Sequence, residues 1–182
     1  MVGLGNPGRR YSQTRHNVGF SFVKRVAKKW EVKLKKRSCL SKTVLASKGG
    51  KKILLALPQT FMNKSGRAVK RILEERGVEP KHLLVVYDDL DIPLGEIRIR
   101  KSGGPGTHNG MSSIIEEIST THFPRIRVGI GPLDPDVTAT DYVLSPFKEE
   151  EKPVLEKSLN HAQKALNYIL DGRIEEAMNR FN

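Results

Sequence analysis

The stretch LLVVYDDLD, residues 83–91, runs from apolar side chains directly into carboxylates. Its first half, Leu83 to Tyr87, is an unbroken apolar run, which is typical of a strand buried on both faces of a parallel sheet. Asp88, Asp89 and Asp91 are expected to form a loop at the carboxyl end of that strand, where α/β sheets place their ligand sites. The stretch therefore predicts an α/β fold with a site beside this strand.

Periodicity on both sides of this strand predicts the remaining elements. Apolar residues at helical spacing indicate helices over 18–30, 60–76, 111–119 and 154–170, and a last helix that reaches 182. Asn17 is the expected N-cap of the first helix. Strand-like runs cover 40–47 and 52–57, joined by a turn at 48–51, and alternating runs cover 95–101 and 125–130.

This order of elements predicts the architecture. Strands and helices alternate without repeats or a long linker, so we expect one α/β domain over residues 1–182, with a mixed, mostly parallel, twisted sheet flanked by helices. The alternating strands are expected to turn one basic face to solvent, formed by Arg98, Arg100, Arg125 and Arg127.

Positive charge is concentrated in the first third of the chain. The protein has 32 Lys and Arg against 20 Asp and Glu, a net charge of +12, and between Arg9 and Lys52 fifteen basic residues stand against the single acid Glu31. Such runs are often only a solubilising surface, but this excess favours a polyanion, because each neutralised phosphate releases counterions. Nucleic acid is the favoured partner. An anionic membrane is second, because few aromatic anchors accompany Phe22 and Trp30.

Cysteine content and hydropathy indicate in which cellular compartment the protein is expected. Cys39 is the only cysteine, which excludes an internal disulfide. No apolar run approaches the roughly eighteen residues that a membrane span needs, and nothing resembles a signal peptide. These features predict a soluble cytoplasmic protein that does not enter a membrane.

The segment GLGNPG, residues 3–8, matches the dinucleotide-binding pattern G-x-G-x-x-G. That motif needs a buried strand before it, a helix that begins at its last glycine and an acid about twenty residues later. Here only Met1 and Val2 precede it, no apolar helical period follows Gly8, and the first acid is Glu31. The segment is therefore interpreted as a turn that presents Asn6.

Residue types suited to acid–base chemistry recur in three further loops. NPGRRYSQTRHN (6–17) holds Asn6, Tyr11 and His16; PQTFMNKSG (58–66) holds Phe61 and Asn63; GGPGTHNG (103–110) holds His108 and Asn109. A histidine beside a carboxylate is a general base at neutral pH, and an asparagine amide can meet an oxyanion or hold a water. Each loop alone is more often a turn or a cap, but four such loops in one small domain indicate a site.

The spacing of metal ligands and nucleophiles narrows the chemistry. The five histidines show no close pairing, one cysteine cannot build a thiolate site, and the three aspartates lack a phosphate-binding loop, so neither a metal nor a cofactor is expected. No G-x-S-x-G motif is present. The sequence thus favours a hydrolase that activates water without a covalent intermediate. An RNA-binding module without catalysis, and a general esterase or nucleotidase, remain as alternatives.

Five segments, in order along the chain, supply more specific information. They are VGLGNPGRRYSQTRHNVGF (2–20), LPQTFMNKSG (57–66), YDDLDIPLGEIRIRKSGGPGTHNGMSSI (87–114), RIRVGIG (125–131) and AMNRFN (177–182). Together they resemble the bacterial-type peptidyl-tRNA hydrolases, which cleave the ester between a peptide and its tRNA. The resemblance implies a monomeric cytoplasmic enzyme that needs no cofactor and recognises the acceptor end and phosphates of peptidyl-tRNA.

The resemblance also implies roles for individual residues. His16 is similar to the family's catalytic base and Asp88 to the carboxylate that supports it. Asn6 is implied to contact the peptide and to help tell N-blocked from free aminoacyl-tRNA. The other positions are implied to hold substrate: Tyr11, Phe61, Asn63 and Asn109 the tRNA end and peptide, with Asn109 also placing the water, and Arg100 and Arg127 a tRNA phosphate.

Two departures from the family pattern have structural consequences. Members of the family usually begin with several apolar residues, whereas only Met1 and Val2 precede the first glycine here, which predicts a short first strand. Pro105 and Thr107 stand in the glycine loop where small residues are common, which predicts a less flexible loop.

Overall fold

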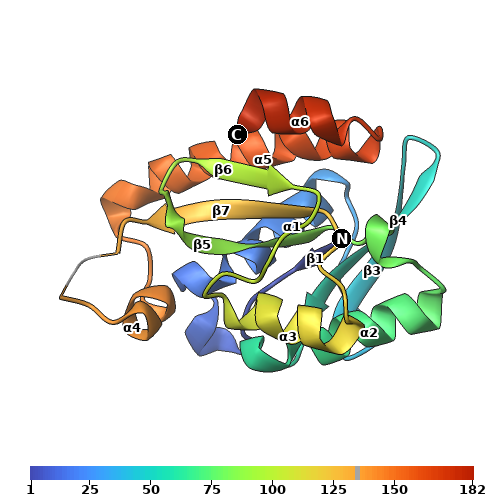
Figure 1. The fold of residues 1–182 in the computed structure, drawn as a ribbon, viewed down its shortest axis with the longest axis horizontal. Coiled ribbons are helices and arrows are strands. Elements are labelled where there is room, and N and C mark those ends of the chain that lie inside the picture. The colour runs from blue at the N-terminus through green and yellow to red at the C-terminus, as the bar shows by residue number, and fades with distance from the viewer. Residues whose placement is uncertain (134–135) are drawn as a thin grey trace.

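The computed structural model describes residues 1–133 and 136–182 and places a seven-stranded sheet between two layers of helices (Figure 1). The strands are β1 (Val2–Gly3), β2 (Lys36–Ser38), β3 (Ser41–Lys48), β4 (Lys51–Pro58), β5 (Val85–Pro93), β6 (Ile97–Arg100) and β7 (Arg125–Gly131), in the order β2-β3-β4-β1-β5-β7-β6. The four central strands are parallel to one another, and the outer pairings are antiparallel. The mixed, mostly parallel sheet predicted from the sequence is confirmed.

Helices cover both faces of this sheet (Figure 1). One face packs against α1 (Val18–Lys29), α5 (Lys152–Leu170) and α6 (Ile174–Phe181), and the other against α2 (Ser65–Arg76) and α3 (Asn109–Ile118). A short helix, α4 (Ala139–Leu144), lies beside the 3₁₀ turn η2 (Arg15–Asn17). The other 3₁₀ turns are η1 (Arg9–Tyr11), η3 (Met62–Lys64), η4 (Pro80–His82) and η5 (Glu149–Glu151). None of the helices described is both long and apolar enough to span a bilayer.

Strand β5 supplies side chains to both hydrophobic cores. Leu84, just before it, and Val86 enter the core under α1 and α5, whereas Val85 and Tyr87 enter the core under α2 and α3. This alternation confirms the prediction of a strand buried on both faces. The predicted loop at 88–91 is wrong, because β5 continues to Pro93. Asp88 and Asp89 stay in register with Val128 and Gly129 of β7, whose backbone completes the ladder whatever side chains they carry. The register shifts between Asp89 and Pro93.

The N-terminal strand differs from the expectation drawn from GLGNPG. Val2 pairs with Ala56 of β4 and with Val85 of β5, so a buried strand does precede the glycine turn. It is two residues long, as the departure from the family pattern predicts, and therefore too short to produce a periodic pattern. Strand β2 and helix α4 were not predicted either, since both are short and β2 is mostly charged.

The basic face of β6 and β7 is only partly exposed. Arg125, expected to face solvent, is 1% exposed. The glycine loop folds over it, and its guanidinium donates to the carbonyl oxygens of Gly103 at 2.7 Å and Thr121 at 2.8 Å. Arg98 and Arg127 are half-buried, and Arg100 is exposed.

The outer edge of β6 is occupied by a side chain from the end of α6. Asn182 accepts a hydrogen bond from the Ile99 N–H at 2.6 Å through Oδ1 and donates to the Ile99 carbonyl oxygen at 3.1 Å through Nδ2. The amide thus satisfies both outward-facing backbone groups of this residue.

Candidate active site

Two histidines share one buried carboxylate at the end of the apolar half of β5. His16 Nδ1 lies 2.8 Å from Asp88 Oδ2, and His108 Nε2 lies 3.2 Å from Asp88 Oδ1. Asp88 is 2% exposed and each histidine 8%. The structure thus brings together three residues that are far apart in the sequence, in a position shielded from bulk water.

The remaining nitrogen of each ring determines what that ring can do. His108 Nδ1 accepts a hydrogen bond from the Met111 N–H at 3.2 Å, so the proton of the neutral ring lies on Nε2 and points to Asp88. His16 donates to Asp88 through Nδ1, which leaves the lone pair of its Nε2 free. His16 is therefore the ring of the pair that can accept a proton from a water molecule.

The carboxylate remains ionised despite its burial. Desolvation disfavours the charge on Asp88, but the two histidines and their hydrogen bonds outweigh this effect and hold the pKa of Asp88 well below its usual range. The rings of His16 and His108 pack 4.9 Å apart, and Tyr87 lies edge-on to His108 at 4.8 Å. Asp88 is thus a fixed acceptor that orients both imidazoles.

The residue before His16 is anchored to the C-terminal part of the chain. Arg15 is 2% exposed, and its guanidinium stacks on the rings of Tyr142 at 4.3 Å and Phe147 at 4.8 Å. It also donates to both carboxylate oxygens of Glu151, at 2.7 and 3.0 Å. Burial opposes the charge on Glu151, but hydrogen bonding to Arg15 outweighs it and lowers the pKa of Glu151.

The residue after His16 is anchored to the glycine turn. The Asn17 side chain accepts from the Asn6 N–H at 2.8 Å and donates to the Asn6 carbonyl oxygen at 3.0 Å. Asn17 was expected to cap α1, and it does occupy the N-cap position, but its side chain makes no capping bond. The expected cap is wrong because the buried backbone of the turn uses both ends of the amide instead.

Asn6 itself is buried and oriented. Its Oδ1 accepts a hydrogen bond from the Met62 N–H at 2.8 Å, which joins the glycine turn to η3. The Nδ2 group of Asn6 is left as a donor. The sequence predicts a turn that presents Asn6, and the structure holds the Asn6 backbone against the side chain of Asn17, the residue after His16.

A small cavity of about 120 Å³ adjoins the histidine pair. It is lined by His16, Asp88 and His108, by Asn109 at the start of α3, and by Thr140 and Val143 of α4. Asn109 and His16, predicted to act together, therefore face the same space.

The other predicted substrate residues of the loops, Tyr11, Phe61 and Asn63, do not line this cavity. Tyr11 and Phe61 pack edge-on at 6.4 Å, and Phe61 is 56% exposed. Asn63 is exposed on η3, next to the residue that binds Asn6.

The two predicted phosphate contacts differ from each other. Arg127 is half-buried, and its Nε lies 2.6 Å from Asp89 Oδ2. Arg100 is exposed. On β7, Arg100 is paired with Arg125 and Asp88 with Val128. Arg100 is therefore displaced from Asp88 by about three residues, or roughly 10 Å, along the strand direction. The structure does not bring Arg100 to the histidine pair.

Potential metal ligands also meet here. The donor atoms of His16, Asp88 and His108 lie within 4.8 Å of one another. Two imidazoles and a carboxylate suit zinc, although a metal would have to replace the hydrogen bonds that now join them. Sequence spacing does not reveal this group, because His16 lies 72 residues before Asp88 and His108 lies 20 residues after it.

Known proteins resemble the chain over its whole length. A family model described as peptidyl-tRNA hydrolase matches residues 1–182. Peptidyl-tRNA hydrolases of Fervidobacterium nodosum and Persephonella marina are 48% and 46% identical, with all of this chain and 94% and 96% of theirs aligned. The crystal structure of peptidyl-tRNA hydrolase from Acinetobacter baumannii has a TM-score of 0.92 at 34% identity, over 98% of this chain and 91% of that one.

Proposed function

The chain belongs to the peptidyl-tRNA hydrolase family and hydrolyses peptidyl-tRNA, and we propose that His16, supported by Asp88, activates the attacking water. The proposal rests on the 2.8 Å contact between His16 Nδ1 and the buried carboxylate. That contact fixes the tautomer in which Nε2 is unprotonated. A base held in this way can deprotonate water directly, and in this proposal it does so without a covalent intermediate.

The reaction follows from this geometry. His16 Nε2 takes a proton from water as the water oxygen attacks the ester carbonyl carbon, and Asp88 stabilises the imidazolium that forms. The tetrahedral intermediate then expels the ribose oxygen of the tRNA, which receives the proton from His16. General base action of this kind contributes about a hundred- to ten-thousandfold to the rate. His108 is a positioning residue, since it acts on the reaction through Asp88.

The developing oxyanion needs a donor beside His16. Asn109 lines the same cavity as His16, and we assign its amide to the oxyanion or to the placement of water. One such donor contributes about a hundred- to a thousandfold. The ester is already activated relative to an amide, so the proposal assigns catalysis to these two effects.

The remaining contacts complete the proposal for the substrate. Asn6 contacts the peptide through its free NH₂ group. Tyr11, Phe61 and Asn63 hold the tRNA end and the peptide, and Arg100 and Arg127 bind a tRNA phosphate. The net charge of +12 supports a polyanionic substrate. The enzyme acts as a cytoplasmic monomer that needs no membrane and no cofactor.

Turnover of N-acetylaminoacyl-tRNA by the wild type and by His16→Ala tests this function. We expect release of free tRNA by the wild type and a rate at least about a hundredfold lower in the variant, with tRNA affinity nearly intact. His122→Ala is a matched control, because His122 is exposed and does not line the cavity. Near-normal turnover by His16→Ala would refute the mechanism. Binding of tRNA without hydrolysis by the wild type would favour an RNA-binding module, and rapid hydrolysis of a small aryl ester alone would favour a general esterase.

A further inference from the structure

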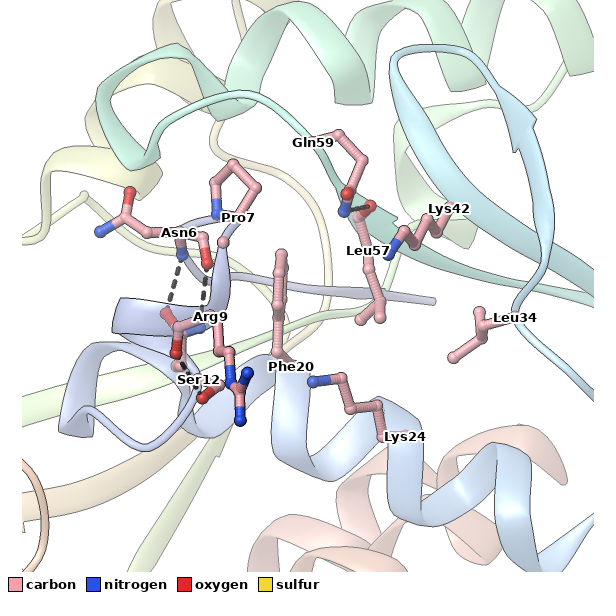
Figure 2. A pocket seen from close by; sticks show the side chains of 12 residues that line it. Asn6, Pro7, Arg9, Ser12, Phe20, Lys24, Leu34, Lys42, Leu57 and Gln59 are labelled. Carbon is pink, nitrogen blue, oxygen red and sulfur yellow. Dashed lines mark hydrogen bonds between the residues drawn. The ribbon is translucent and has the colours of Figure 1, made fainter.

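A second and larger cavity is lined by the glycine turn at Asn6, Pro7 and Gly8 (Figure 2), and His16 is not among its lining residues. Its volume is about 460 Å³, within the range of about 300 to 1,000 Å³ that is usual for small-molecule sites. Asn6 and Asn17 line it, so it shares the two residues that lock the turn to the His16 loop. The cavity is therefore beside the active site but is not used by the proposed mechanism.

Three cations surround this cavity. Arg9 comes from η1, Lys24 from α1 and Lys42 from β3. Figure 2 shows the ammonium groups of Lys24 and Lys42 directed toward the space between Phe20 and Leu57. Within residues 1–133 and 136–182, no carboxylate pairs with any of the three, and none lines the cavity.

The two lysines repel each other in this arrangement. Burial lowers the pKa of Lys24, and the charge of Lys42 lowers it further. Like charges held around one space without a carboxylate are stabilised when an anion enters that space. The cavity is thus built for a ligand that carries a negative charge.

Apolar side chains, among them an aromatic ring, line the cavity next to the two lysines, since Phe20 lies one turn before Lys24 on α1 and Leu57 pairs with Lys42 across β3 and β4. Phe20 and Leu57 are 5% and 3% exposed, and Pro7 and Leu34 extend the same surface. Lys24 Nζ lies 5.9 Å from the centre of the Phe20 ring. A flat heterocycle can pack against such a surface while an attached anion reaches the lysines.

A hydrogen-bonding group stands beside these apolar side chains. Gln59 donates to the carbonyl oxygens of Leu57 and Pro58, both at 3.1 Å, through Nε2. Its Oε1 is left to accept a hydrogen bond from a ligand. An exocyclic amine of a base would supply the donor that this oxygen lacks.

We propose that this cavity binds one nucleotide unit, with its phosphate between Lys24 and Lys42 and its base against Phe20 and Leu57. The nucleotide belongs either to the single-stranded end of the tRNA or to a free mononucleotide, and the first case rests on the proposed function. A peptide segment fits less well, because it brings no fixed negative charge to satisfy the lysines.

Titration of the full chain with adenosine and cytidine 5′-monophosphates, followed by NMR or calorimetry, tests the proposal. We expect Lys24→Ala and Lys42→Ala each to weaken binding by about tenfold, since each removes a charge-assisted contact. Lys28→Ala is the matched control, because Lys28 is exposed one turn further along α1 and does not line the cavity, and it should change affinity by less than about twofold. Inorganic phosphate and the free nucleosides should bind more weakly than the monophosphates.

Several results would overturn the proposal. These are no binding of either monophosphate, equal weakening by Lys28→Ala, and occupation of the cavity by an N-acetylated peptide instead. Because the titration requires no turnover, its outcome is independent of whether the enzyme hydrolyses peptidyl-tRNA.

Kinetics then distinguish the two sources of the nucleotide. If it belongs to the tRNA end, Lys24→Ala raises KM for N-acetylaminoacyl-tRNA without changing kcat, and the monophosphates compete with substrate. If it is free, KM is unchanged in Lys24→Ala and the monophosphates do not compete. Either pattern, together with the binding result, supports a nucleotide site.

Discussion

The side-chain oxygen of Asn6 accepts a hydrogen bond from the backbone N–H of Met62 at 2.8 Å. Because this bond uses the carbonyl end of the amide, only the NH₂ end is free to meet the substrate. Figure 2 shows the Asn6 amide directed away from the nucleotide cavity. A donor in this position favours the amide carbonyl of an N-blocked substrate and offers nothing to the ammonium of a free aminoacyl group.

Asn6→Asp tests whether the Asn6 amide determines the preference for N-blocked over free aminoacyl-tRNA. The carboxylate can keep the bond to the Met62 N–H and present its second oxygen, which attracts an ammonium. Buried polar groups left without partners cost about 1 to 3 kcal/mol, so we expect the preference for N-acetylaminoacyl-tRNA over free aminoacyl-tRNA to narrow by about tenfold. The ratio of the kcat/KM values for the two substrates, compared between the variant and the wild type, measures this preference. An unchanged ratio would restrict Asn6 to shaping the turn.

Asp88→Asn should change both rate and pH dependence. Without the carboxylate, the imidazolium of His16 loses its stabilisation, so we expect slower turnover and an acidic limb of the kcat/KM profile that differs from that of the wild type. The depressed pKa of Asp88 means that its contribution to folding is present above its ordinary pKa of about 3.9 and is lost as the pH falls below that value. Urea unfolding between pH 6 and 2, chosen to span about that range, should show a weaker acid destabilisation in Asp88→Asn than in the wild type. Identical profiles would contradict the role of the carboxylate.

Chelation should leave the enzyme active, whereas added metal should inhibit it. Because water activation is assigned to His16, EDTA is expected to leave kcat/KM unchanged. Added Zn²⁺ should inhibit, since its binding to His16, Asp88 and His108 would occupy the base. Both effects are read from initial rates after dialysis against chelator. Activity that disappears with EDTA and returns with zinc would instead make the metal part of the enzyme.

The two arginines proposed to bind phosphate should behave differently. Arg100 is exposed and has no ion pair among the described residues, whereas Arg127 already contacts Asp89 at 2.6 Å. Arg100→Ala is therefore expected to raise KM and to lower the slope of log KM against log salt by about one. Arg127→Ala should change that slope less, because part of its charge is neutralised. Equal slopes in Arg100→Ala and the wild type would remove Arg100 from the tRNA contact.

Glu151→Gln should destabilise the fold and the active site together. The substitution leaves the buried Arg15 guanidinium without its charged partner, so a loss of about 1 to 3 kcal/mol in the free energy of unfolding is expected. Because Arg15 precedes His16, kcat should also fall. Glu156→Gln is the control, as Glu156 makes a more exposed pair with Arg25. A stable Glu151→Gln variant with normal kcat would contradict the anchoring role.

The main fold could be predicted because its long elements repeat a pattern. The apolar run at 83–87 and the helical spacing of α1 and α5 report burial directly. Strand β1 could not be found in this way, since its two residues are specified by their neighbours β4 and β5 rather than by periodicity. The burial of Arg125 could not be predicted either, because it depends on the glycine loop, which lies about twenty residues earlier in the chain.

The sequence predicted which residue types form the site, but not all of the hydrogen bonds that join them. His16 and Asp88 were singled out together, and their contact is as expected. The position of His108 on the same carboxylate depends on the path of the glycine loop, which no local pattern encodes. Likewise, Asn17 binds the backbone of Asn6 and does not cap the helix, because the buried Asn6 N–H and carbonyl oxygen have no other hydrogen-bond partner among the residues that the structure describes.

The amide of Asn182 on β6 also affects how copies of this protein meet. An outer strand with free N–H and carbonyl groups is a template on which a strand from another molecule can add, and this is a common route to aggregation. At Ile99 both groups are already taken by the Asn182 side chain, which imitates the next strand of a sheet. At the opposite border, β2 presents Lys36 and Arg37, whose charges repel an identical strand. The sheet is thus protected at both borders against growth by self-association, by a side chain at one and by electrostatic repulsion at the other.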